Sequence, residues 1–162
     1  MRGMMTLGLW LGLAVTAPAQ IQSFTVTPGA LSFTALNPDT GGPAPQASTV
    51  VVVFNGRPSG SWVLYVQAES ANLENCGTVP VSAVEVRCVT ASLAGNGPGN
   101  AACNSSALSL SSSPQMVAQG RQGNRLSTMT VGLQLGFADQ WRYRAALSPA
   151  CSVFLRYTVD IP

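Results

Sequence analysis

Apolar and polar residues alternate strictly over residues 127–137, STMTVGLQLGF. The apolar side chains fall at the odd positions, which are Met129, Val131, Leu133, Leu135 and Phe137. A period of two is typical of a β-strand that buries one face. That face has to pack on a second sheet or on helices, and no convincing amphipathic helix follows residue 19. The pattern therefore predicts an all-β protein in which sheet packs on sheet.

Similar patterns recur along the chain. We expect two short strands hinged at Pro28-Gly29 within residues 21–36, further strands at 48–54, 61–68, 81–89, 127–137 and 151–161, and short edge strands at 108–110 and 115–118. The unbroken Val50 to Val53 run indicates a strand covered on both faces, and Trp62 is the expected core aromatic. Residues 37–45 and 95–102 are rich in Pro, Gly and Asn and are expected to be irregular. The spacing favours an immunoglobulin-like β-sandwich of about seven to nine strands.

The N-terminus has the features of a secretory signal peptide. Arg2 supplies a positive start, residues 7–15 (LGLWLGLAV) form a short apolar run, and Ala17 and Ala19 are the small residues that a signal peptidase reads. The run is shorter than the ~20 apolar residues that a membrane-spanning helix needs. We therefore expect residues 1–19 to be removed and residues 20–162 to form a single domain, without a membrane span, outside the cell or on its surface after passage through the periplasm.

The charge and the composition argue against several classes of function. Charged residues make up 9% of the chain and the formal net charge is +2, which argues against nucleic-acid binding. The chain has no His and no Lys, so catalysis by a Ser–His or Cys–His pair and Schiff-base chemistry are excluded. The six carboxylates are scattered, at Asp39, Glu69, Glu74, Glu85, Asp139 and Asp160. They form neither the paired acids of a glycosidase nor an Asp-rich metal loop, and we expect no enzymatic activity, no cofactor and no metal.

Four cysteines, Cys76, Cys88, Cys103 and Cys151, follow the expected signal peptide. An even number of cysteines in an oxidising compartment indicates two disulfides, for which three pairings exist. The first expectation is Cys76–Cys88, which closes a short loop, together with Cys103–Cys151. The main alternative joins Cys88 to Cys151, because both fall on apolar faces. A zinc site is disfavoured because the spacings contain no Cys-x-x-Cys pair.

Two segments of the first third carry a family resemblance. FTVTPGALSFTA and QASTVVVVFNGRPSGSW contain Val26, Pro28, Leu31, Phe33, the Val50 to Val53 run and Gly60-Ser61-Trp62. This order resembles the opening of secreted bacterial immunoglobulin-like domains, including the BACON type, and the overall plan is similar to that of fimbrial and pilus subunits. The resemblance implies an immunoglobulin-like fold. The cysteine-bearing second half departs from the BACON pattern, and with it from that family's carbohydrate-binding role.

Two segments are candidates for interaction. Residues 20–27 can be donated to a neighbouring subunit with Phe24 and Val26 as anchors, or can simply be the first strand of their own sandwich. Residues 139–144, DQWRYR, interleave aromatics with arginines. On a strand, one face would carry Trp141 and Tyr143 and the other Arg142 and Arg144, as a ligand platform or as a core-capping pair with an arginine-guarded edge.

These observations predict a secreted, non-enzymatic, disulfide-stabilised protein. The function they favour is that of a structural subunit of an extracellular filament or cell-surface assembly, joined to itself or to other surface subunits by strand pairing. The alternative is a secreted adhesion module that binds glycans or a surface receptor. A small periplasmic accessory protein is a third hypothesis.

Overall fold

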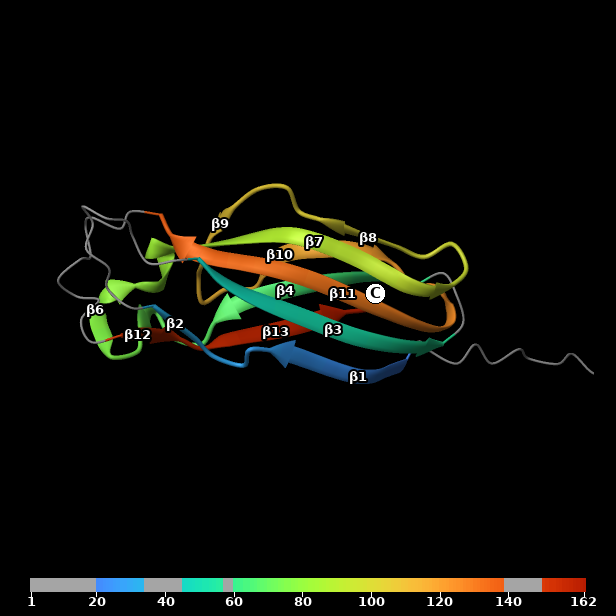
Figure 1. Ribbon diagram of the computed structural model, residues 1–162, viewed down its shortest axis with the longest axis horizontal. Coiled ribbons are helices and arrows are strands. Elements are labelled where there is room, and N and C mark those ends of the chain that lie inside the picture. The colour runs from blue at the N-terminus through green and yellow to red at the C-terminus, as the bar shows by residue number, and fades with distance from the viewer. Residues whose placement is uncertain (1–19, 34–44, 57–59, 139–149) are drawn as a thin grey trace, which may run out of the picture.

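The computed structural model describes residues 20–33, 45–56, 60–138 and 150–162 (Figure 1). The expected signal peptide lies outside these residues. The fold is all-β, with two disulfides, and its strands run along the length of an elongated molecule. The one helical element of the described chain is a 3₁₀ turn at Val81–Ala83. The predicted all-β class is thus confirmed, while the immunoglobulin-like topology stays a prediction.

Nine strands form two antiparallel sheets. The five-stranded sheet has the order β1 (Gln20–Thr27), β3 (Gln46–Gly56), β11 (Asn124–Phe137), β7 (Val84–Asn96) and β9 (Leu108–Ser109). The four-stranded sheet has the order β13 (Leu155–Asp160), β4 (Ser61–Ala68), β10 (Gln115–Arg121) and β8 (Asn100–Cys103). Two short ribbons, β2 (Leu31–Phe33) with β12 (Cys151–Val153) and β5 (Asn72–Leu73) with β6 (Cys76–Pro80), lie at the left end of the molecule in Figure 1.

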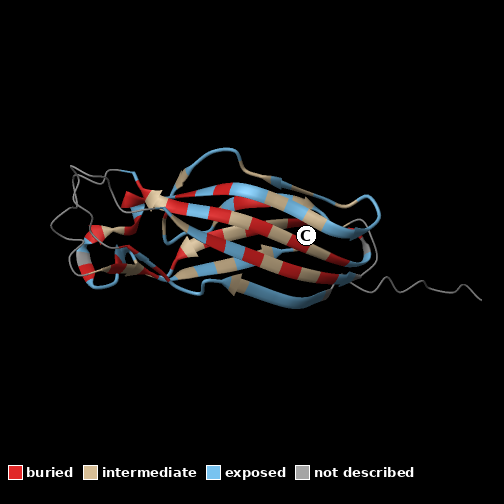
Figure 2. Cartoon of the chain, in the orientation of Figure 1, coloured by how far each residue is buried: buried red, intermediate tan, exposed pale blue. Residues whose placement is uncertain are grey.

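The alternating pattern of residues 127–137 is the inner face of β11. Its five apolar side chains are all buried, and β11 lies between β3 and β7 at the centre of its sheet. Facing it, β4 buries Trp62, Leu64, Val66 and Ala68, and the Trp62 ring stacks with Phe54 at a centroid separation of 6.5 Å. Figure 2 shows the resulting bands of buried residues along the strands. Each fully buried Leu or Val contributes roughly 1.5–3 kcal/mol, so this shared core holds the two sheets together.

At the predicted hinge at Pro28-Gly29 the chain leaves the five-stranded sheet. Before the hinge, β1 pairs with β3 in the five-stranded sheet. After it, β2 pairs with β12, whose chain continues as β13 in the four-stranded sheet. At this end of the molecule Phe33 packs edge-on against Phe137, with ring centroids 4.9 Å apart.

Several local expectations are wrong, and the predicted strand at 81–89 begins only at Val84 because Val81–Ala83 form the 3₁₀ turn. Residues 95–102 are not irregular throughout, because β7 continues to Asn96 and β8 begins at Asn100, which leaves only a tight turn between them. Strand β10 is not an edge strand, since it lies between β4 and β8. The run Val50 to Val53 is fully covered on one face only, because Val51 and Val53 point away from the core and are half-buried.

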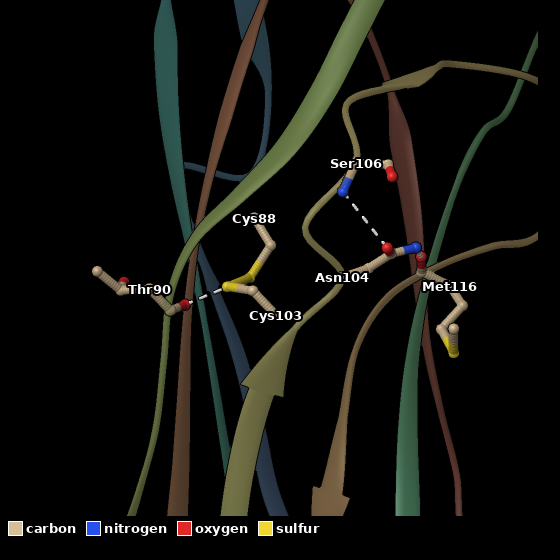
Figure 3. Close-up of a disulfide and its surroundings, with 6 residues drawn as sticks. All are labelled: Cys88, Thr90, Cys103, Asn104, Ser106 and Met116. Atoms are coloured by element: carbon tan, nitrogen blue, oxygen red, sulfur yellow. Dashed lines mark hydrogen bonds between the residues drawn. A yellow bond between two sulfur atoms is a disulfide. The ribbon is translucent and has the colours of Figure 1, made fainter.

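Both expected cysteine pairings are wrong. The disulfides join Cys76 to Cys151 and Cys88 to Cys103, with Cα–Cα distances of 5.5 Å and 5.4 Å. Cys88 lies five positions into β7, and at ~3.3 Å per residue the strand carries it away from β6 and Cys76. The chain then turns back as β8, which lies against β7 and brings Cys103 to Cys88 (Figure 3).

Candidate strand-pairing flank

The two long sides of the molecule differ in how the sheets are joined. On one side β7 of the five-stranded sheet leads through a tight turn into β8 of the other sheet, and Cys88–Cys103 links these strands covalently (Figure 3). On the other side the sheets end at β1 and at β13. No disulfide of the described chain joins these two edge strands. We call the side formed by β1 and β13 the open flank.

A hydrogen bond fixes the position of β13 on the open flank. Tyr157 of β13 lies with its hydroxyl 3.1 Å from the hydroxyl of Ser48 on β3, the neighbour of β1. Burial raises the pKa of Tyr157, and the hydrogen bond with Ser48 partly offsets this effect. The Tyr157 side chain therefore spans the space between the sheets at this level.

The inner face of β1 is incompletely covered. Phe24 pairs with Val52 and Ile21 with Phe54, and paired residues of an antiparallel ladder point to the same side. Both partners on β3 are fully buried, yet Ile21 is 37% exposed and Phe24 39% exposed. The cause is that β1 is the outermost strand, while the sheet that should cover it ends at β13.

The predicted anchor residues Phe24 and Val26 lie on the inner face of β1, a strand that is paired within its own chain. Val26 is half-buried against the core and Phe24 points to the same side. Sequence reasoning missed Ile21, because a bulge between Ile21 and Ser23 shifts the alternation by one residue. A period-two count places Ile21 and Phe24 on opposite faces, so no simple signal in the sequence reveals their shared side.

The edge strand β13 carries the other half of the open flank. Leu155, Tyr157 and Val159 point inward and are half-buried, whereas Arg156, Thr158 and Asp160 are exposed. The only partner strand recorded for β13 in the described chain is β4. Its other backbone edge is thus a template on which a further strand can pair.

A second candidate lies on the outer face of the four-stranded sheet. A shallow hollow of about 370 Å³ crosses three strands of this sheet. Its polar lining comes from Ser61, Asn100, Gln119 and Arg121, and the small residue Ala102 lies opposite Gln119 on the same face. Amide and guanidinium groups over small residues are suited to hydrogen-bonding a hydroxyl-rich ligand.

The other predicted site residues fall in different places. The platform residues Trp141, Arg142, Tyr143 and Arg144 lie outside the described residues. Of the carboxylates, Glu69 forms an exposed ion pair with Arg156, with 3.6 Å between the guanidinium nitrogen and the carboxylate oxygen. The described part of the chain holds no group of three His, Cys, Asp or Glu side chains placed to bind a metal ion. It also holds no helix with the length and hydropathy needed to cross a membrane.

Comparisons of the chain with protein-family models, with curated proteins and with solved structures each found no match.

Proposed function

We propose that the protein is a structural subunit of an extracellular filament or cell-surface assembly, and that copies join by pairing of β1 with the sheet of a neighbouring copy. The main support for this proposal is the position and exposure of β1. It is an edge strand with one pairing neighbour, it precedes a Pro-Gly hinge, and its inward-facing Ile21 and Phe24 are more than a third exposed.

Exchange of β1 between copies would keep every contact that the strand makes now. In the neighbour, Phe24 and Val26 would lie beside Val52 and Val50 of β3, as they do within one chain. Exchange of an identical element is a low-cost route to assembly, and a head-to-tail exchange that does not close yields a filament. Main-chain hydrogen bonds supply the affinity and the alternate side chains fix the register.

Two further features support this function. All four cysteines are joined in two disulfides, as expected of a protein that matures in an oxidising compartment. The chain also carries few charges for its size, and on β1 it carries none, so that nothing repels a strand of another copy from this edge.

The test is the assembly state of the full chain and of variants in β1, by negative-stain microscopy and by gels of unheated samples. Deletion of residues 20–27 and the double change Phe24→Asp/Val26→Asp should abolish filaments or a heat-sensitive ladder. Thr25→Asp is the matched control, because Thr25 pairs with Val51 on the outer face and is exposed. Wild-type protein that stays monomeric, or a Phe24→Asp/Val26→Asp variant that assembles normally, overturns the proposal.

The hollow lined by Gln119 and Arg121 favours a second candidate, a module that binds glycans or a surface receptor. In that case the protein remains monomeric and binds a sugar in a glycan screen, and Gln119→Ala with Arg121→Ala removes binding. Unchanged binding by this double variant would exclude the hollow as the binding site.

A further inference from the structure

The free edge of β13 is self-complementary. Its exposed residues are Arg156, Thr158 and Asp160, with opposite charges placed two residues to either side of Thr158. Its inward residues Tyr157 and Val159 flank the same centre. Two such strands laid antiparallel with Thr158 opposite Thr158 place each Arg156 opposite an Asp160, and each Tyr157 opposite a Val159.

We infer that two copies of the protein pair through their β13 edges, antiparallel and centred on Thr158, about a two-fold axis perpendicular to the sheet. The contact joins the two four-stranded sheets into one continuous sheet. It is isologous, since each copy contributes the same residues. The strand pairing itself uses β13 and not β1, so it can form whether or not β1 is exchanged between copies.

The side-chain pairs on both faces favour this register. Opposite charges directly across a strand pair stabilise it, and so do aromatic side chains across from β-branched ones. Because of the two-fold axis, each pair occurs twice, on the outer face for the charges and on the inner face for Tyr157 with Val159. A shift by two residues along the strand would separate the charges, so the charge pattern selects a single register.

Arg156 is free to make the new contact at little cost. Its present partner is Glu69, at 3.6 Å, and the two side chains are 63% and 49% exposed. Exposed ion pairs of this kind contribute little to folding, so the guanidinium can turn toward a second copy.

The same contact explains the incomplete cover of the open flank. The registers of β1 with β3 and of β13 with β4, together with the stacking of Phe54 on Trp62, place Phe24 and Val159 at similar levels along the molecule. Because the axis is perpendicular to the sheet, the open flanks of the two copies face each other across the seam. Ile21 and Phe24 of both copies then lie along the seam, where water is displaced from their exposed area.

The other edge strand of the flank lacks these properties. Strand β1 contains no charged residue, and its bulge at Ile21–Ser23 interrupts regular pairing. Nothing in β1 fixes a register for pairing with itself through its free edge. Strand β13 is therefore the edge that specifies a second copy of this chain.

Charge reversal tests the contact, with the full chain and sedimentation equilibrium over a concentration series. Arg156→Asp leaves two acidic residues facing each other, and Asp160→Arg leaves two arginines. Each should raise the dimer dissociation constant by about tenfold or more, since two attractive pairs become repulsive. The double variant R156D/D160R restores the pairs and should dimerise like the wild type.

Mixing the two single variants is the decisive measurement. An equimolar mixture of R156D and D160R should form a heterodimer, because each acidic residue then faces an arginine. Loss of the intramolecular pair with Glu69 cannot produce this rescue. The matched control is Arg87→Asp, at an exposed position on the outer face of β7, which should leave the dimer unchanged.

Disulfide cross-linking tests the same contact without a change of charge, in case a charge variant folds poorly. Thr158→Cys should give a disulfide-linked dimer under mild oxidation, because residue 158 faces its own copy, whereas Ser92→Cys on the opposite side of the molecule should not. The F24D/V26D variant removes the exchange of β1 and should still form dimers. Only the dissociation constant of these dimers should rise, because Phe24 lies along the seam but takes no part in the pairing of β13. A wild type that is monomeric at all concentrations, or mixed variants that stay monomeric, overturns the inference.

Discussion

Tyr157 on β13 and Ser48 on β3 join their hydroxyl groups across the two sheets at 3.1 Å. Ser48 is 2% exposed, so its hydroxyl has no access to solvent as an alternative partner. This hydrogen bond is a polar contact in a mostly apolar interior, and it lies on the side where no disulfide of the described chain joins the sheets. Loss of this hydrogen bond should change both the stability of the protein and the pH dependence of that stability.

Tyr157→Phe should lower the free energy of unfolding at neutral pH by about 1–3 kcal/mol, because the buried Ser48 hydroxyl loses its partner. The variant should also change how the free energy of unfolding depends on pH in the alkaline range. Burial raises the pKa of Tyr157 above its ordinary value of 10.0, so the folded state holds the phenolic proton more tightly than the unfolded state. The contribution of Tyr157 to the free energy of unfolding is therefore fully present below pH 10.0 and is lost as the pH rises from there through the raised pKa.

Urea denaturation on either side of that pH measures the effect. The wild type should lose more stability on the alkaline side than Tyr157→Phe does. Tyr65→Phe is the control, since it leaves Tyr157 in place and should retain the wild-type loss. If the wild type and Tyr157→Phe lose the same stability at alkaline pH, Tyr157 does not cause this loss.

The two disulfides should differ in their contribution to stability. Cys76–Cys151 spans 75 residues and Cys88–Cys103 spans 15. Loop-closure entropy gives about 4.5 kcal/mol for the longer span and about 3 kcal/mol for the shorter. Replacing each pair by Ala and measuring denaturant midpoints should therefore show the larger loss for Cys76→Ala/Cys151→Ala. The opposite order would indicate that residual structure in the unfolded chain, or local strain, outweighs loop length.

Gly120→Ala should distort the four-stranded sheet. A Cβ at this position of β10 would collide with the backbone carbonyl oxygen of Asn100 on β8 and would lie 2.7 Å from Cζ2 of Trp62. Overpacking of this kind costs about 1–3 kcal/mol. Gly29→Ala is the matched control, because no atom of the described residues lies within 4 Å of a Cβ there, and its effect should stay below about 1 kcal/mol. Thermal unfolding of the two variants checks the difference, and equal midpoints would contradict it.

Gln122→Met should preserve or raise stability. Gln122 is 3% exposed, and its Nε2 atom donates to no group among the residues that the structure describes. A buried amide without a partner costs about 1–3 kcal/mol, and Met fills a similar volume without polar atoms. Gln119→Met, at an exposed position of β10, should change stability by less than about 0.5 kcal/mol. A clear loss of stability in Gln122→Met would mean that the amide holds an internal water molecule.

The inner faces of the strands were predictable because they depend on local alternation alone. Met129 to Phe137 and Trp62 to Ala68 bury the residues that period two assigns to the core. Where the backbone departs from a regular strand the same rule fails. The bulge after Ile21 places this residue on the side of Phe24, and the break at Phe154 divides the predicted last strand into β12 and β13.

The sequence by itself determined the all-β class, the buried faces of the main strands and the hinge between two short strands at Pro28-Gly29, since each follows from the geometry of a few neighbouring residues. Only the tertiary structure decided which cysteines meet, that β10 is an inner strand, and that β1 and β13 end their sheets on one open flank. These features depend on which strands become neighbours. Neighbours such as Ser48 and Tyr157 are separated by a long stretch of chain, and no local pattern records their meeting.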